Sequence, residues 1–300
     1  MRLEMTDKKK LPFCGSPISV ATMGEELFMH CSFCDDFINV FNRSNLRKVK
    51  HVIQTRYYNF HPRAIVACNL SNCVYVLGQK VKRLNISLVA KITKDDGNQY
   101  VVSSWISDLT PNVKYIISVS PEGSLILSRT EGTDEIIRIY KIDGSFQQEI
   151  RLNLYLFNVT RIIPKSNGNL VFVSLTQRLD FVAFKTQLTE TSLDGNIVRQ
   201  YHSSLPAADV DYADSEDRLL IVDRDNKLEL LDPQFNPVHV NFPKETSDNL
   251  WAHPALVHYD RLRNEVLVIE FKFEIGATLS IINFREDKDF SDLVMTRKID

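Results

Sequence analysis

A short acidic run in the last third of the chain has residue types that could bind a calcium ion. The segment from Asp223 to Gln234 reads DRDNKLELLDPQ. A helix-loop-helix calcium loop would need oxygen donors at alternate positions, glycine at the sixth position and glutamate at the twelfth. Here the fifth, sixth and twelfth positions are lysine, leucine and glutamine. We therefore expect Asp223 and Asn226 to hydrogen-bond backbone amides of their own turn.

The cysteines suggest zinc, because four thiolates can close a structural zinc site. All five lie in the first quarter of the chain, and the last four have the spacings Cys-x-x-Cys and Cys-x₄-Cys. These four fall at the ends of different expected strands or in a loop, with no obvious common point. We expect free thiols, buried or half-buried, that pack like small hydrophobic groups. The five residues are Cys14, Cys31, Cys34, Cys68 and Cys73.

Basic and aromatic residues in the first third could hold phosphates and stack on bases of single-stranded RNA. A solvated charged edge is the interpretation that we favour, because lysine commonly protects the edges of sheets. RNA or partner contact stays the alternative. The residues concerned are Arg43, Arg47, Lys48, Lys50, Tyr57, Tyr58, Lys80, Lys82 and Arg83.

The elements that position these residues recur along the chain with a period of about 48 residues. A β-rich run, a turn and a second β-rich run appear six times, and the turn residues are 48, 51, 45, 49 and 47 positions apart. A second turn follows later in each unit, seen as Asp-Gly in three units. Asp-Gly between extended runs predicts a tight hairpin turn. The six markers are Gly24, Asn72, Gly123, Gly168, Asp217 and Asn264.

The repeat predicts an all-β fold, a six-bladed β-propeller of four-stranded antiparallel blades with about 48 residues per blade. We expect residues 1–17 to be an N-terminal segment and residues 18–300 to be a single propeller domain. The last blade needs a fourth strand to close the ring. Residues 292–299 could supply it, and residues 2–5 could add to the same sheet.

Two blades resemble NHL repeats in motif as well as in length. LLIVDRDNKLELLDP follows the NHL pattern closely, and GSLILS with IRIYKIDGSFQQEI follows it more loosely. The other four blades are similar only in spacing. The resemblance implies a divergent NHL-like six-bladed propeller. Some proteins with NHL propellers bind single-stranded RNA on one face, so the resemblance permits RNA as a ligand.

Other six-bladed propellers resemble lactonases, in which several inner strands contribute ligands to a divalent ion in the central channel. Of the expected inner strands, only the fifth brings carboxylates, Asp209 and Asp211, and the sixth brings His258. One acidic strand is a poor site for a hard cation. We therefore predict no catalytic residue, metal or cofactor, and a metal-dependent hydrolase is a further alternative.

Composition and charge restrict the remaining classes. Hydrophobic residues make up 44% of the chain, without an apolar run of signal-peptide or membrane-span length. An odd number of cysteines favours a reducing compartment, so we expect a cytoplasmic protein. Residues 1–100 contain 15 basic and 8 acidic residues, whereas residues 201–300 contain 11 and 20. We predict a non-enzymatic, monomeric scaffold that binds protein partners through its loop faces, without membrane contact.

Overall fold

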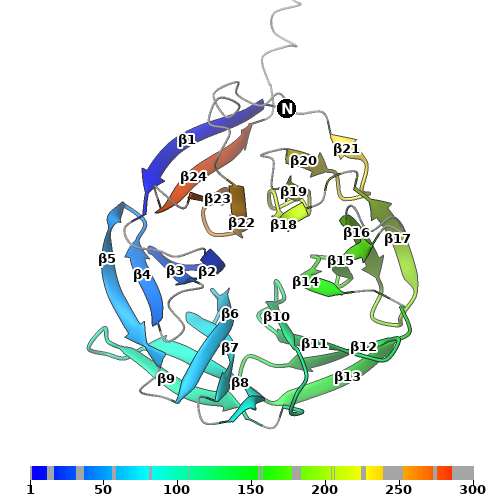
Figure 1. The fold of residues 1–300 in the computed structure, drawn as a ribbon, viewed down its shortest axis with the longest axis horizontal. Coiled ribbons are helices and arrows are strands. Elements are labelled where there is room, and N and C mark those ends of the chain that lie inside the picture. Colours follow the sequence, from blue (N-terminus) through cyan, green and yellow to red (C-terminus); the bar gives the residue numbers. More distant parts are fainter. Residues whose placement is uncertain are drawn as a thin grey trace, which may run out of the picture.

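The protein is a ring of six four-stranded antiparallel sheets arranged around a central axis, as Figure 1 shows. The predicted all-β six-bladed propeller is confirmed. The computed structural model describes residues 2–11, 17–31, 37–55, 59–80, 83–107, 109–154, 156, 158–177, 184–203, 205, 207–223, 228–238, 253–272 and 276–285.

Within blades one to five the strands follow the chain order from the axis outward. Neighbouring strands are antiparallel and pair in a simple meander. The strands of blades one to three are β2 (Pro17–Met23), β3 (Glu26–Cys31), β4 (Phe37–Asn42), β5 (Asn45–Gln54), β6 (Phe60–Cys68), β7 (Cys73–Lys80), β8 (Arg83–Lys94), β9 (Tyr100–Ile106), β10 (Ile116–Val119), β11 (Leu125–Glu131), β12 (Asp134–Tyr140) and β13 (Phe146–Leu152).

Blades four and five continue the same pattern, and blade six completes the ring with strands from both ends of the described chain. The strands of these three blades are β14 (Val159–Pro164), β15 (Leu170–Gln177), β16 (Phe184–Thr191), β17 (Ile197–His202), β18 (Ala207–Tyr212), β19 (Leu219–Asp223), β20 (Leu228–Leu231), β21 (Pro237–Val238), β22 (His253–Asp260), β23 (Glu265–Lys272), β24 (Gly276–Arg285) and β1 (Arg2–Lys10).

The ring is closed by β1, which pairs antiparallel with β24 from Arg2 opposite Arg285 to Lys10 opposite Thr278. The N-terminal segment therefore contributes the outermost strand of blade six. The expected boundary after residue 17 implied a separate N-terminal segment, whereas residues 2–10 belong to the propeller. Residues 292–299, the other expected source of this strand, lie outside the described residues.

The turns between the first and second strands have the backbone conformation that the repeat predicts. All six marker residues have a positive φ, between 46° at Asn72 and 86° at Gly123. L-residues other than glycine, asparagine and aspartate rarely adopt this region, and only these three residue types occur at the six positions. A conformational requirement thus accounts for the residue type at each marker.

The second turns of blades two, three and four are hairpin turns, as the Asp-Gly pairs predicted. In blade three the amide of Gly144 donates to Lys141 O at 2.9 Å, and Gly144 has a φ of 88°. In blade two the positive φ falls on Asn98, one residue after the expected Gly97. Asparagine tolerates this conformation, so the turn forms with the glycine in an ordinary position.

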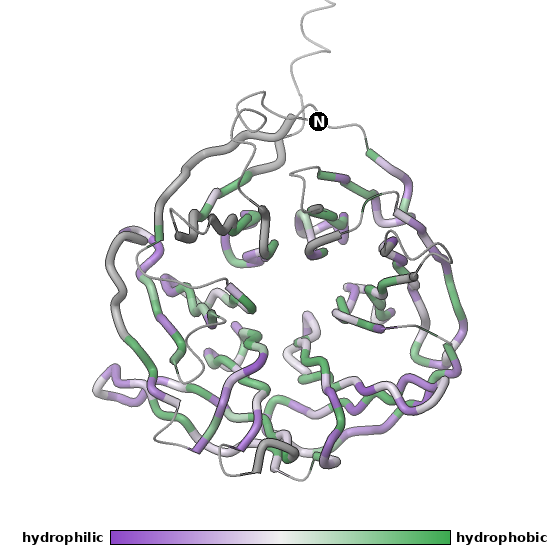
Figure 2. Tube along the Cα trace, in the orientation of Figure 1, coloured by the Kyte–Doolittle hydropathy of each residue, from purple (hydrophilic) through white to green (hydrophobic). Residues whose placement is uncertain are grey.

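The hydrophobic cores lie between neighbouring blades. One cluster joins blades one and two through Phe28, Ile38, Ile65 and Val76, and a second joins blade six to blade one. Figure 2 shows hydrophobic and hydrophilic stretches alternating along many of the described strands. Because each blade buries its apolar faces against its neighbours, the blade joints fix the ring and the positions of the six innermost strands.

Candidate functional site

The innermost strands of the six blades line a central channel with a volume of about 940 Å³. These strands are β2, β6, β10, β14, β18 and β22. Aliphatic side chains such as Val20, Ile65 and Val257 cover much of the wall, and polar side chains from blades four, five, six and one gather on one side. A cavity of this size that is mostly apolar and has a few convergent polar groups is a candidate ligand or catalytic site.

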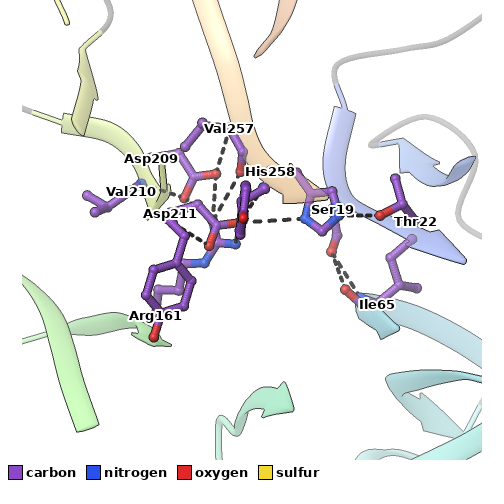
Figure 3. Close-up of polar contacts among 11 residues, drawn as sticks. Ser19, Thr22, Ile65, Arg161, Asp209, Val210, Asp211, Val257 and His258 are labelled. Atoms are coloured by element: carbon purple, nitrogen blue, oxygen red, sulfur yellow. Dashed lines mark hydrogen bonds and ion pairs between the residues drawn. The ribbon is translucent and has the colours of Figure 1, made fainter. Parts of the chain in front are cut away.

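The centre of the polar cluster is Arg161 on β14. Its Nη1 donates to both Oδ1 and Oδ2 of Asp209 at 2.9 Å, and its Nη2 donates to Oδ2 of Asp211 at 2.6 Å. Figure 3 shows these contacts between blade four and blade five. One planar guanidinium therefore pairs with both carboxylates of the acidic strand, one through each terminal nitrogen.

The same carboxylates also join blade five to blade six. The amide of Val257 donates to Asp209 Oδ2 at 3.0 Å, and the amide of Tyr259 donates to Asp211 Oδ2 at 3.1 Å. Both donors belong to β22, the innermost strand of blade six. Buried backbone amides need partners. These two carboxylates supply partners across a blade joint where neighbouring sheets do not pair.

His258 extends the network into blade one. Its Nδ1 lies 3.6 Å from Asp211 Oδ2, and its Nε2 lies 3.0 Å from Thr22 Oγ1. On the same strand as Thr22, Ser19 Oγ donates to Ile65 O at 3.2 Å and accepts from the Ile65 amide at 2.9 Å. The polar contacts in Figure 3 thus run from blade four through blades five, six and one to blade two.

The two carboxylates respond differently to the same surroundings. Burial raises the pKa of Asp211, but Arg161 and the hydrogen bond from His258 outweigh burial and lower this pKa to about 2. Burial also raises the pKa of Asp209, and Arg161 and the Val257 amide offset only part of that rise. For Arg161, the two carboxylates outweigh burial and raise the pKa of the guanidinium. The same surroundings thus favour the charged form of Asp211 more strongly than that of Asp209.

This arrangement places a positive side chain between the two carboxylates of the acidic strand. The guanidinium of Arg161 lies where a cation shared by Asp209 and Asp211 would bind, so both carboxylates already have a positive partner. Among the described residues, no group of three or more His, Cys, Asp or Glu side chains could hold a metal ion. In the acidic run considered first, Asp223 ends β19 and residues 224–227 lie outside the described residues.

Asp211, His258 and Thr22 lie in the order of an acid, a base and a hydroxyl nucleophile, the order used in acyl transfer. The contact from His258 Nδ1 to Asp211 is long, at 3.6 Å, and Thr22 is only 3% exposed. Asp211 also accepts from Arg161 and from the Tyr259 amide. These contacts are those of a group that holds blades together, although all three side chains border the channel.

The expected free thiols are found at two of the three described cysteines. Cys68 and Cys73 are free and buried, and they are directly opposite each other on β6 and β7. Cys31 corrects the expectation, because it is disulfide-bonded to a partner outside the described residues. Cys14 and Cys34 also lie outside them.

Arg43 is the first of the basic positions considered in blades one and two. Arg43 lies in the turn between β4 and β5 and is 4% exposed. Its guanidinium forms ion pairs with Asp260 and, at 2.5 Å, with Glu265, both in blade six. Arg43 is therefore not available to an outside ligand. It is a buried ion-pair partner at the joint between the first and last blades.

The other predicted contact residues are only partly described. Lys80 ends β7 and is half-buried. Four more positions have a described backbone but no described side chain: Arg47, Lys48 and Lys50 in β5, and Arg83 at the start of β8. The remaining three, Tyr57, Tyr58 and Lys82, lie outside the described residues.

Sequence reasoning missed Arg161 and Thr22, although the signal was present in the repeat. Arg161 is 48 positions before Asp209 and 50 before Asp211, and the Val257 amide is 48 positions after Asp209. One repeat is about 48 residues, so residues one period apart lie at the same height on neighbouring inner strands. A search for opposite charges one period apart would have found the ion pair.

Exposed hydrophobic side chains concentrate on one side of the ring. We call this side the turn face: it carries the turns between the first and second strands and between the third and fourth strands. Of the eleven large hydrophobic residues exposed in the described part, eight lie in these turns or in the next two residues. They are Leu70, Val101, Ile142, Phe146, Leu193, Ile197, Val198 and Leu262.

Comparisons with known proteins identify the fold but no family. No protein-family model matches the chain, and no curated protein matches it in sequence. The crystal structure of Raptor from Chaetomium thermophilum is similar to 94% of this chain, with a TM-score of 0.60 and 8% sequence identity. The similar region is 29% of that chain, so this protein spans less than a third of its length. At this identity the likeness shows the fold alone.

A membrane-spanning helix is not among the elements of the described residues.

Proposed function

We propose that this protein is a β-propeller scaffold that binds protein partners through its loop faces and catalyses no reaction. The observation that supports this proposal is the concentration of exposed hydrophobic side chains on the turn face. Leu70 is 67% exposed and Leu262 is 61% exposed, both in turns where a polar residue would meet the same backbone requirement. Exposed apolar residues that gather on one face of a domain can mark an interaction site.

The channel supports the same proposal. Its ionisable groups hydrogen-bond to one another and to backbone amides of the next blade, so their contacts serve to join blades. A catalytic acid or base instead exchanges a proton with the reacting group, so it must be able to contact the substrate. The kinship with NHL repeats remains part of the proposal and depends on the motifs of two blades.

The scaffold proposal can be tested by site-specific photo-crosslinking in an extract of the native host. A benzophenone amino acid would replace Ile142 on the turn face, or Val52 near the opposite ends of the blades as the matched control. The two positions are 40% and 48% exposed. We expect protein adducts at position 142 that resist ribonuclease and exceed those at position 52. Equal adducts at both positions, or loss after ribonuclease treatment, would contradict the proposal.

Single-stranded RNA is the alternative ligand for the basic part of blades one and two. The excess of basic over acidic residues in residues 1–100 supports it, although Arg43 is used internally. We expect weak, sequence-independent binding that falls steeply as salt rises. A gel shift should lose this binding when Lys48, Lys50, Lys80, Lys82 and Arg83 are replaced by Ser. Tight binding of one RNA sequence at physiological salt would favour this alternative over the scaffold.

A hydrolase is the second alternative, and the order of Asp211, His258 and Thr22 supports it more than any metal site does. A fluorophosphonate probe reacts with activated hydroxyl nucleophiles and would label Thr22 if His258 activates it. We expect the Thr22→Val variant to be labelled no less than the wild type. Labelling of the wild type that is lost in Thr22→Val and in His258→Gln would favour the hydrolase.

Location and assembly complete the proposal. The odd number of cysteines supports a cytoplasmic protein. The closed ring supports a monomer, because a closed propeller leaves only short edges for self-association. The disulfide of Cys31 counts against a reducing compartment. Localisation of the tagged protein and light scattering of the purified protein test these two points.

A further inference from the structure

The strongest unexplained surface is a small apolar patch beside one mouth of the channel. A methyl group added at Gly123 would lie 3.3 Å from Leu70 Cδ1 and 3.4 Å from Ile142 Cδ1. Leu70 comes from blade two, and Gly123 and Ile142 come from two turns of blade three. Pro121, next to this glycine, borders the channel together with Leu70. We call these four residues the Leu70 patch.

The patch is exposed, and its floor is rigid. Leu70 is 67% exposed and Ile142 is 40% exposed. Beneath them Cys68 is 1% exposed, and its thiol lies 3.7 Å from Gly123 O. Gly123 has a φ of 86°, which a larger residue would adopt only with strain. Gly123 itself is buried, because Leu70 and Ile142 pack over it, and the outer faces of these two side chains form one small apolar surface on a fixed backbone. Such a surface can accept an apolar group at little conformational cost.

The charges around the Leu70 patch are mostly acidic. The turns of blades two to four on the turn face carry one exposed basic residue, Lys141, and a buried one, Lys165, in the described part. The exposed acidic residues there are Asp95, Asp96, Glu122, Asp143 and Asp194. Glu122 is adjacent to Pro121, and Asp143 is adjacent to Ile142.

Of the acidic groups beside the patch, Asp143 is held in its charged form by its own turn. Hydrogen bonds from the hydroxyl and the amide of Ser145 hold the pKa of Asp143 below its ordinary value. An exposed negative field around an apolar patch attracts a partner of opposite charge and repels acidic ones. Charge complementarity therefore identifies the chemistry of the occupant.

We infer that the Leu70 patch binds a segment of a partner protein in which an apolar side chain is flanked by lysine or arginine. The apolar side chain would lie against the exposed faces of Leu70 and Ile142, and the basic residues would face Glu122 and Asp143. This inference rests on the proposed scaffold function and adds to it the position of the contact and the chemistry of the partner.

Selection of random twelve-residue peptides displayed on phage against the immobilised full-length protein tests the inference. We expect the enriched peptides to combine aliphatic or aromatic residues with lysine or arginine. Their binding should weaken at least about tenfold in Leu70→Ser with Ile142→Ser, as expected when a central apolar anchor is lost. Leu262→Ser is the matched control, because Leu262 is 61% exposed in a blade-six turn and should leave binding unchanged.

A charge variant tests the second half of the inference. Glu122→Gln with Asp143→Asn keeps the size of both side chains, and asparagine keeps the oxygen that accepts from Ser145. We expect weaker binding of the enriched peptides and a smaller dependence on salt. Glu216→Gln in blade five is the control, with a side chain that is 66% exposed. Thermal melts of all variants establish that each one is folded.

The outcomes separate this inference from the scaffold proposal. Enrichment of acidic peptides, or of basic peptides that bind the patch variants equally well, would overturn the inference and leave the scaffold proposal standing. If no peptide is enriched, and photo-crosslinking at position 142 also yields no protein, both would be wrong.

Discussion

Arg161 shows how one side chain can replace a cation in a propeller channel. Its guanidinium contacts the carboxylates of Asp209 and Asp211 from a neighbouring blade, at distances of 2.6 to 2.9 Å. A guanidinium is permanently charged and directional, so it holds the two strands in one relative position. The residue types on the acidic strand could be predicted from the sequence. Their partner could not, because residues were compared within blades and not one period apart.

Acid should weaken the fold through Asp211. The pKa of Asp211 is lowered to about 2 in the folded protein and is about 4 in the unfolded chain. The contribution of Asp211 to the free energy of unfolding is therefore complete above about pH 4 and is lost as pH falls toward 2. We expect wild-type stability to fall by about 2 kcal/mol from this group over that interval. Urea unfolding at pH 2 to 5 measures it. Asp211→Asn should lack this part of the pH dependence, whereas Asp194→Asn, in an exposed turn, should keep it.

Gly144 should tolerate alanine less well than Gly132 does. Both residues have a positive φ, 88° and 66°, so alanine carries a backbone cost of about 1 kcal/mol at either position. At Gly144 the new methyl group would also lie 2.9 Å from two ring atoms of Trp105, whereas at Gly132 nothing lies within 4 Å. We expect Gly144→Ala to lose about 2 kcal/mol more than Gly132→Ala in urea unfolding. Equal losses would show that the indole moves aside freely.

At the scale of elements, neighbouring blades are joined by buried charged residues as well as by apolar clusters. Glu190 on β16 is fully buried. Its Oε2 accepts from Lys165 at 3.1 Å and forms an ion pair with Arg199 at 3.0 Å. Lys165 Nζ also donates to Pro233 O in blade five at 2.9 Å, and both cations lie close to the ring of Phe235. This carboxylate thus orders the joint between blades four and five.

Removing the charge of Glu190 should destabilise the protein strongly. Glu190→Gln leaves Lys165 and Arg199 without their anionic partner, and Lys165 is only 3% exposed. We expect a loss of about 3 kcal/mol in the free energy of unfolding, as for a broken buried ion pair. Glu149→Gln is the control: its 2.7 Å ion pair with Arg138 is partly exposed and should be worth less than about 1 kcal/mol. Similar losses in both variants would contradict this assignment.

The number and order of the strands could be predicted from the sequence, because each turn between them requires a particular backbone conformation. A positive φ selects glycine, asparagine or aspartate, and these residues recur wherever the chain reverses between a first and a second strand. The joints between blades have no such local signal. The pair of Arg43 with Asp260 connects residues in the first and last blades, and nothing in the neighbouring sequence of either residue indicates the other.

For the whole molecule, closure by β1 is the feature on which the ring depends. Without β1, the outer edge of β24 would expose unpaired backbone groups along most of its length. We expect deletion of residues 2–10 to lower the melting temperature and to promote aggregation. Calorimetry and light scattering measure these effects. Deletion of residues 290–300, the segment first expected to close the ring, is the comparison, and a larger effect there would place the closing strand elsewhere.

The two ends of the chain differ in net charge, and residues from both ends pair where the ring closes. The basic first third and the acidic last third meet at the joint of blades one and six, as the closed ring predicts. There Arg43 pairs with Asp260 and Glu265. Opposite net charges at the two ends of the chain therefore favour the correct neighbours, in addition to any effect on outside partners.

The position of β1 also has a consequence for synthesis on the ribosome. Residues 2–10 are translated before the other described strands, and their partner strand, residues 276–285, is translated after all of them. Until β24 has been made, β1 therefore lacks the strand with which it pairs. Its sequence, RLEMTDKKK, is mostly charged, and charged strands pair poorly with other chains. The lysines at the end of β1 should therefore protect the chain from aggregation until β24 has been translated. Replacing these lysines with apolar residues should cause aggregation during synthesis before it lowers the stability of the folded ring.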